Sequence, residues 1–134
     1  MEKPEAVIRL RLGSEDAHYG GGLVAGSKIL EIFGDVATEL SVRYDGDEGL
    51  LRAYEATEFL APVYAGDFIE ARGRLTDVGD TSRRYELEAY KVIVPRPDVN
   101  DSAADVLDEP LLVCRAIGIG VVRKARQRAR RELR

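Results

Sequence analysis

The 134-residue chain has one cysteine, one histidine and no tryptophan. A single cysteine excludes an intrachain disulfide and a zinc site of several cysteines, and a single histidine excludes a multi-histidine metal site. No apolar run approaches the ~20 residues that a membrane-spanning helix needs, and no basic-then-apolar signal peptide opens the chain. We therefore expect no metal site and a location in the cytoplasm.

The size and composition of the chain are those of one globular domain, spanning 1–134. Hydrophobic residues make up 45% and charged residues 33% of the sequence, an ordinary balance for a folded protein. A chain of this length can build a hydrophobic core without disulfides or metals.

Charge is distributed unevenly along the sequence. Residues 123–134 carry seven basic side chains and one acidic one, which leaves a net charge of −10 on residues 1–122 because the total is −4. The acidity of residues 1–122 argues against a nucleic-acid-binding domain, because such a domain needs a basic surface. We expect the basic tail either to be a solvated end or to contact phosphate groups.

Hydrophobic periodicity predicts one strand and one long helix in the first third of the chain. Residues 6–12 alternate with period two, as a strand does. Residues 13–26 contain five glycines and predict a loop. Apolar residues then recur at three- and four-residue steps over 28–42, which predicts an amphipathic helix with Ser27 as its N-cap. Gly34 lies inside this helix, where we expect close packing.

The rest of the chain is dominated by period-two patterns after a turn at 44–49. The break at 95–110 is rich in proline and acidic residues, and we expect an exposed excursion there. One helix followed by antiparallel strands is an α+β arrangement. We expect the sheet to wrap the helix and its edge to be covered by a second copy, giving at least a homodimer. The predicted strands are 50–60, 68–78, 83–94 and 111–123.

The glycine-rich loop is the first candidate site. The order Gly26-Ser27-Lys28 fails the phosphate-loop pattern, which needs Gly-Lys-Ser/Thr. A glycine loop entering a helix still presents free backbone N–H groups, which suit an anion or a developing oxyanion. The alternative is a tight structural turn. The loop also carries residues able to act in catalysis or to serve only as hydrogen-bonded structure, namely Asp16, His18 and Tyr19.

Three carboxylates form a stripe on the predicted helix, at Glu31, Asp35 and Glu39. Such a stripe either faces solvent or takes part in catalysis. If two of the acids are partly buried and close together, the pKa of one carboxyl group is raised, and the two can then act as acid and as base. Glu58 interrupts an apolar stretch, and we expect it on the solvent face of a strand or in contact with substrate. Cys114 lies mid-strand without a neighbouring base, as a core cysteine does.

These segments together resemble a known family. The ordered blocks DAHY (16–19), GDVATEL (34–40), DGDE (45–48), EFLAPVYAGDFIE (58–70), EAYKV (88–92) and DEP (108–110) resemble the 3-aminobutyryl-CoA and β-alanyl-CoA ammonia-lyases of amino-acid fermentation, such as lysine fermentation. The resemblance covers roughly residues 7–122. It implies the hotdog fold, an antiparallel sheet around one long helix.

The resemblance also implies an activity and an assembly. These enzymes remove ammonia from a β-aminoacyl-CoA to give the enoyl-CoA, or add it. They are dimers or hexamers (trimers of dimers) with sites at the dimer interface, and they need no metal or prosthetic group. The expected partner is therefore an acyl-CoA substrate, with coenzyme A entering as part of it and no further cofactor.

Site residues follow from the resemblance and the chemistry of elimination. The helix entrance would donate hydrogen bonds to an enolate oxygen. Asp35 or Glu39 would take the α-proton while the other holds the ammonium group, and His18 and Tyr19 would orient the thioester or relay a proton. Cations would bind the CoA phosphates. The expected substrate-binding residues are Val24, Ala25, Gly26, Ser27, Glu58, Arg83 and Arg84, with the basic tail.

Two other functions stay open at this point. The first is an acyl-CoA thioesterase on the same fold, in which an acid activates water. Related thioesterases have their helix acid seven residues after a pair of small residues, whereas Ala25-Gly26 and Asp35 are nine apart, and Ala17 stands where many have asparagine. The second is a non-catalytic module that binds acyl-CoA.

Overall fold

The structure, a computed structural model, describes residues 3–128. The predicted tail continues beyond this range, so its last six residues lie outside the described part. Three short 3-10 segments accompany the main elements, at Ser14–Asp16, Gly20–Gly22 and Lys124–Arg126. The helix and strands are β1 (Glu5–Arg11), α1 (Gly26–Asp45), β2 (Leu50–Phe59), β3 (Phe68–Val78), β4 (Ser82–Pro95) and β5 (Ala104–Val121).

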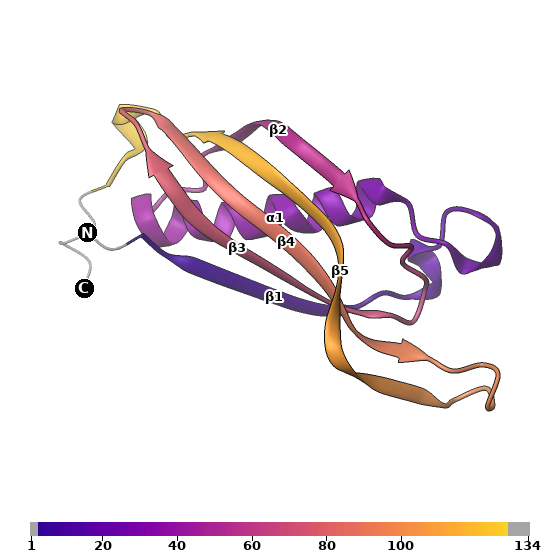
Figure 1. Ribbon diagram of the computed structural model, residues 1–134. Helices are drawn as coiled ribbons and strands as arrows, with labels where there is room; N and C mark the ends of the chain where they lie inside the picture. The colour runs from indigo at the N-terminus through magenta and orange to yellow at the C-terminus, as the bar shows by residue number, and fades with distance from the viewer. Residues whose placement is uncertain (1–2, 129–134) are drawn as a thin grey trace.

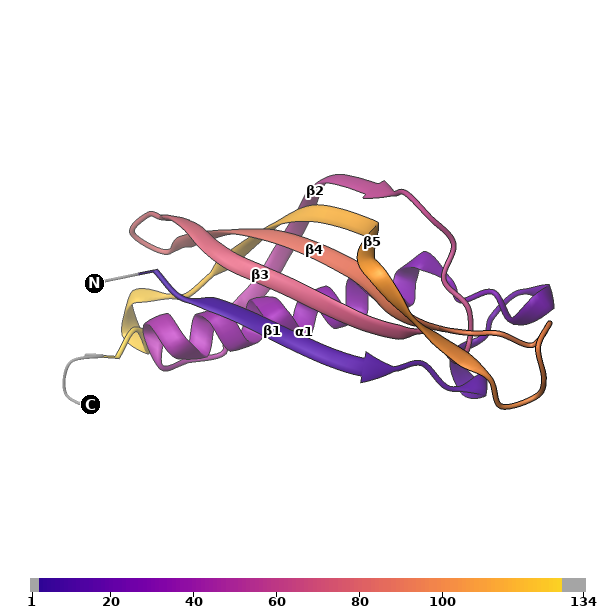
Figure 2. The same ribbon diagram turned by 60° about the horizontal axis from the view of Figure 1, so that its bottom comes forward.

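The strands form one antiparallel sheet in the order β1-β3-β4-β5-β2, with α1 along one face (Figure 1). The α+β prediction and the hotdog arrangement of one long helix against one sheet are therefore confirmed. The turned view shows that the sheet curves over α1 without enclosing it (Figure 2). The prediction that the sheet wraps around the helix is confirmed in this form, with the side of α1 away from the sheet free of strands in the described part of the chain (Figure 2). Among residues 3–128, no helix is long and apolar enough to cross a membrane.

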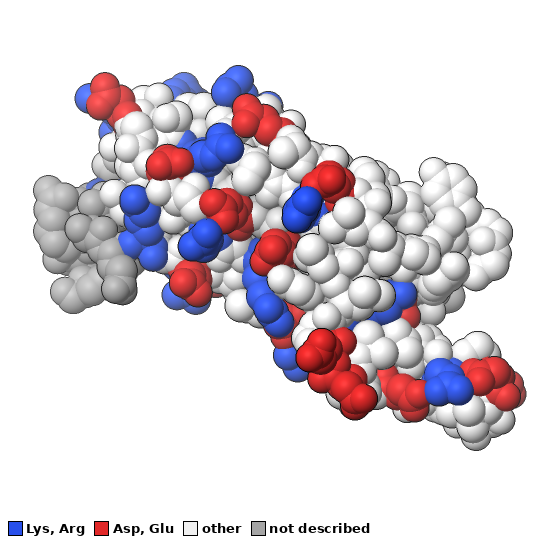
Figure 3. Space-filling model, in the orientation of Figure 1, with Lys and Arg blue, Asp and Glu red and all other residues white. Residues whose placement is uncertain are grey.

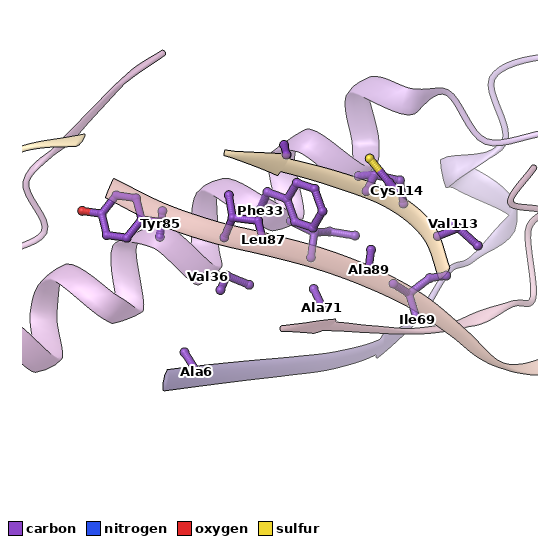
Figure 4. Packing of buried hydrophobic residues seen from close by; sticks show 14 of the residues in the cluster. Ala6, Phe33, Val36, Ile69, Ala71, Tyr85, Leu87, Ala89, Val113 and Cys114 are labelled. Atoms are coloured by element: carbon purple, nitrogen blue, oxygen red, sulfur yellow. The ribbon is translucent and has the colours of Figure 1, made fainter. Parts of the chain in front are cut away.

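The hydrophobic core lies between α1 and the sheet. Phe33, Val36 and Leu40 of the helix have no exposed surface. Phe33 and Val36 lie in one cluster with Ile69 of β3 and Leu87 of β4 (Figure 4). Each such side chain contributes about 1.5–3 kcal/mol by leaving water. The apolar periodicity of the helix therefore determines which side of α1 packs against the sheet.

Close packing occurs at a strand glycine rather than at the helix glycine. A Cβ on Gly73 of β3 would come within 2.5 Å of Val36 Cγ1, so the glycine lets the helix approach the sheet. A Cβ on Gly34 would find its nearest neighbour, the Tyr54 hydroxyl, at 3.8 Å. The prediction of tight packing at Gly34 is therefore wrong.

The two ends of α1 are formed by different means. The helix begins at Gly26, and Ala25 is the N-cap residue, with no side-chain cap. The prediction of Ser27 as N-cap is wrong, because the extended chain before the helix ends two residues earlier. At the other end, Gly46 adopts a left-handed conformation (φ 71°) and its N–H donates to the carbonyl of Val42. This is the usual role of glycine at a helix C-terminus.

A buried ion pair fastens the last helical residue to β4. Arg83 donates from Nε and Nη2 to the two carboxylate oxygens of Asp45 at 2.8 and 2.9 Å. Its Nη1 donates to the carbonyls of Gly79 and Ser82, and both charged side chains are almost fully buried. The prediction that Arg83 binds a CoA phosphate is contradicted by this position, because its guanidinium is engaged inside the protein.

The predicted excursion at 95–110 is exposed, but half of it is strand. β4 continues to Pro95 and β5 begins at Ala104, so the two extend as a paired arm beyond the sheet body (Figure 1). Val106 on this arm is 75% exposed. Acidic side chains gather on the arm, whereas acidic and basic side chains alternate over the sheet face seen in Figure 3.

The two glycines give a matched pair of stability predictions. Gly73→Ala should lower the free energy of unfolding by about 1–3 kcal/mol, since its Cβ has to displace core atoms. Gly34→Ala should raise it by up to about 1 kcal/mol, because alanine is the better helix former and the added methyl group finds space. Urea unfolding followed by circular dichroism measures both. Equal destabilisation by the two substitutions would contradict the packing described.

Candidate active site at the start of the helix

The glycine-rich loop folds back on itself before entering α1. The N–H groups of His18 and Tyr19 both donate to the carbonyl of Leu23, at 2.9 and 3.0 Å. Gly21 and Gly22 have φ of 73° and 80°, a region that favours glycine. The loop therefore holds His18 and Tyr19 at the surface, next to its tip of Gly20–Gly22, where their rings meet edge to face.

A second segment holds this loop in place. Val24 donates to the carbonyl of Val63 at 2.8 Å, and Ala65 donates to that of Gly22 at 2.9 Å. The connection between β2 and β3 thus runs beside the glycine-rich loop at the end of the molecule where α1 begins (Figures 1 and 2). Two backbone segments far apart in sequence fix the position of the helix entrance.

The helix entrance presents free backbone donors, as predicted for this loop. Within residues 3–128, the N–H groups of Gly26 and Ser27 have no hydrogen-bond acceptor, whereas that of Lys28 donates to Ala25. The N-terminus of a 20-residue helix also carries a partial positive charge. An oxygen that gains negative charge would be stabilised there.

An apolar cleft opens beside these donors. The ring of Phe59 lies against the helix start, so that a Cβ on Gly26 would come within 2.5 Å of it. The cleft has a volume of about 600 Å³. It brings together the predicted residues Tyr19 and Val24–Ser27, along with residues that the sequence did not indicate. The latter are Leu23, Ile29, Phe59, Leu60, Ala61, Pro62, Val63 and Val113.

A polar recess lies on the other side of the helix start. It measures about 340 Å³, and Asp16, His18, Ser27, Lys28 and Glu31 are among its lining residues. Asp16 accepts a hydrogen bond from the N–H of Gly13 and pairs with Lys28 at 3.3 Å. The hydrogen bond from Lys28 to Glu31 and a smaller contribution from Asp16 raise the pKa of the Lys28 ammonium group. Asp16 therefore lines the polar recess and also makes structural contacts with Gly13 and Lys28.

The predicted helix acids lie further along α1, on the side away from the sheet. Asp35 is exposed in the single chain, and Glu39 pairs with Arg43 at 2.8 Å. Glu31 likewise pairs with Lys28. The single chain does not bury two of these carboxylates together, so the coupled pair considered from the sequence is not formed within it.

Tyr54 is a neighbour of Asp35 that the sequence did not reveal. Its hydroxyl donates to the carbonyl of Leu30 at 2.5 Å and lies beside Gly34. Burial, with smaller contributions from Cys114 and Asp35, raises the pKa of Tyr54 to about 12. The hydroxyl therefore stays protonated at neutral pH and fixes edge strand β2 to the helix.

Two further predicted residues lie away from the helix entrance. Glu58 pairs with Arg115 at 2.6 Å on the sheet face opposite the helix, in line with its expected position on a solvent face. The structure does not bring Glu58 into the apolar cleft. Arg84 is partly exposed and pairs with Glu55 at 3.4 Å and Asp77 at 3.9 Å.

Cys114 is a core residue, as predicted. Its side chain is buried against the helix, and burial raises the pKa of the thiol to about 11. The nucleophilic thiolate is therefore scarce at neutral pH. Across residues 3–128, no cluster of three or more histidine, cysteine or acidic side chains is arranged to hold a metal ion.

The buried thiol predicts a pH dependence of stability. A raised folded-state pKa contributes stability that is full below pH 9, the unfolded value, and is lost as pH rises towards 11. Over this pH range, the free energy of unfolding of Cys114→Ala should fall by about 1–3 kcal/mol less than that of the wild-type protein. The substitution should leave activity intact. Urea unfolding of both proteins between pH 8 and about 11 measures the difference in slope. An unchanged slope, or an inactive variant, would contradict this assignment.

Comparison with known proteins places the chain in a family. No family model matches it. It is 58% identical over 124 residues to the 3-aminobutyryl-CoA ammonia lyase of Acetoanaerobium sticklandii, covering 92% of this chain and 98% of that protein. The structure also matches the β-alanyl-CoA:ammonia lyase of Clostridium propionicum, with a TM-score of 0.90 and 39% identity, over 96% of this chain and 91% of that one.

More distant structures share the fold. A hexameric hotdog-fold thioesterase of Campylobacter jejuni matches with a TM-score of 0.72 at 18% identity, over 90% of this chain and 85% of that one. A hexameric broad-specificity acyl-coenzyme A thioesterase matches with a TM-score of 0.72 at 20% identity, over 92% and 82%. The identity of 58% to the 3-aminobutyryl-CoA ammonia lyase extends over nearly the whole chain. The chain therefore belongs to the hotdog-fold family of CoA-thioester ammonia lyases.

Proposed function

We propose that the protein eliminates ammonia from a β-aminoacyl-CoA, 3-aminobutyryl-CoA being the first candidate, and that it catalyses the reverse addition to crotonyl-CoA. The 58% identity to a 3-aminobutyryl-CoA ammonia lyase over 92% of the chain carries this proposal. The free amides between an apolar cleft and a polar recess support it, because an acyl thioester has an apolar chain and an oxygen that becomes negative.

The elimination requires a base for the α-proton, hydrogen-bond donors for the enolate oxygen and an amino group that is protonated when it leaves. A base removes the α-proton, and the electron pair of that C–H bond forms the enolate. The electron pair of the enolate then forms the Cα–Cβ double bond as the C–N bond of the protonated amino group breaks. The C–N electron pair leaves with nitrogen as ammonia, and the base keeps the α-proton. Amide donors at Gly26 and Ser27 would hold the enolate oxygen. Side chains and backbone can supply every part, so we propose that no metal or further cofactor takes part.

The helix geometry limits which acid serves which site. Asp35 is nine residues beyond Gly26, so it lies about 13 Å further along the axis, and Glu39 lies about 20 Å along. The oxygen and the α-carbon of a thioester are only two bonds apart. A thioester held at the amides of one chain therefore cannot present its α-carbon to Asp35 or Glu39 of the same chain.

We infer that the site is shared between two copies of the chain, with the helix entrance of one facing Asp35 or Glu39 of the other. The exposed position of Asp35 leaves it available for such a contact. The hexameric thioesterases on the same fold show that the fold is compatible with assembly. His18, in the polar recess, is the alternative base within one chain.

The activity has a direct test. Crotonyl-CoA and ammonium, mixed with the enzyme, should lose the absorbance of the enoyl thioester without releasing CoA thiol, and a chelator should change neither result. Elimination from 3-aminobutyryl-CoA should give the reverse signal. Thiol release from crotonyl-CoA without ammonium would indicate a thioesterase instead. CoA-ester binding without turnover would indicate a non-catalytic module.

The shared site predicts complementation between two variants. Ser27→Pro removes one amide donor in the first helical turn, where proline is tolerated, and should lower kcat about 10²- to 10³-fold. Ser27→Ala keeps the N–H group and should retain activity. Asp35→Asn should also be impaired. After unfolding and refolding together, equal amounts of Ser27→Pro and Asp35→Asn should recover about a quarter of wild-type activity through mixed dimers.

Two outcomes of this experiment would contradict the shared site. If the mixture is no more active than its components, both residues serve one chain or Asp35 has no role. If Asp35→Asn alone is fully active, His18 or Glu39 becomes the base. Circular dichroism of each variant confirms that it is folded.

A further inference from the structure

A buried ion pair of Lys91 and Asp67 lies beneath the helix entrance. Lys91 comes from β4, and Asp67 directly precedes β3. Their exposed fractions are 7% and 1%, and Lys91 Nζ lies 3.1 Å from Asp67 Oδ2. Neither residue lines the apolar cleft or the polar recess.

The remaining side-chain contacts of the pair converge on the segment 62–67, and the carbonyl of Asp67 accepts from the N–H of Leu12 at 3.0 Å. Lys91 Nζ donates to the carbonyl of Pro62 at 2.8 Å, and its ammonium group lies 5.4 Å from the centre of the Tyr64 ring. The N–H of Tyr64 donates to Asp67 Oδ2 at 2.7 Å. The pair thus holds this segment from both of its ends.

The same segment holds the glycine-rich loop. Val63 accepts from Val24 and Ala65 donates to Gly22, as described above. Val24 is two residues before Gly26, whose N–H is the first free donor of the helix. A continuous set of contacts therefore leads from the buried charges to the amides of the proposed oxyanion site.

A buried ion pair contributes little net stability, so the contacts that it makes are the better guide to its role. Removing two charges from water costs several kcal/mol per ion, and a hydrophobic replacement of both is often at least as stable. We infer that Lys91 and Asp67 are positioning residues for catalysis, which fix segment 62–67 and through it the amides of Gly26 and Ser27. This inference rests on the function proposed above.

The chain supplies its own control in the Arg83–Asp45 pair. That pair is also buried, with exposed fractions of 2% and 0%, and is joined by two hydrogen bonds. It lies at the C-terminal end of the 20-residue helix, about 30 Å from the entrance. Breaking it disturbs a buried charge to a similar degree without touching segment 62–67.

The experiment compares Lys91→Met and Asp67→Asn with Arg83→Met and Asp45→Asn in the full chain. Thermal unfolding is measured first, and kinetics are then measured well below every melting temperature, per folded enzyme. We expect all four variants to melt earlier. Lys91→Met and Asp67→Asn should also lower kcat about 10²-fold, because a small misplacement of donors lowers the rate steeply. KM should change much less.

Rescue by a similar charge separates positioning from packing. Lys91→Arg keeps a cation that can bridge Asp67 and the Pro62 carbonyl, so it should retain at least a tenth of wild-type kcat. Arg83→Met and Asp45→Asn should keep wild-type kcat. Full kcat in Lys91→Met, or an equal loss of kcat in the Arg83 and Asp45 variants, would overturn the inference. If the wild-type enzyme shows no lyase turnover, the proposed function fails instead.

Discussion

The structure depends on backbone pairing between the glycine-rich loop and the connection from β2 to β3. Two hydrogen bonds, from Val24 to Val63 and from Ala65 to Gly22, determine where the extended chain ends and α1 begins. That position leaves the first amides of the helix unpaired, beside the ring of Phe59. Catalytic groups are held more accurately when a rigid element carries them, and here the element is a 20-residue helix packed on a sheet.

Most of the fold could be predicted because it follows from local patterns. Period two indicated the strands, and steps of three and four residues indicated one helix. The predictions failed where contacts between residues far apart in sequence determine the local structure. Ser27 is not the N-cap, because pairing of Val24 with Val63 ends the extended chain at Ala25. The arm of β4 and β5 lies partly outside the predicted strands, because the acidic residues and prolines after Pro95 have low strand propensity.

The candidate site was only partly predictable. The glycine loop and the residues Val24–Ser27 lie together, because one continuous segment contains them. Phe59 and Tyr54 reach the helix from another strand, and no local pattern in the sequence indicates that contact. Arg83 could have been placed correctly, since it shares its side of β4 with Tyr85 and Leu87, and the alternating pattern therefore puts it in the interior.

One helix carries both the free amides and the acids, but they are too far apart to act on the same thioester. This separation is the central reason to infer a site shared by two copies. A crystal structure with a stable thioether analogue of 3-aminobutyryl-CoA tests it most directly. We predict that the acyl group lies at the Gly26 and Ser27 amides, with Asp35 or Glu39 of a second copy near the α-carbon. An acyl group bound away from the helix entrance, or one contacted by a single chain only, would contradict the account.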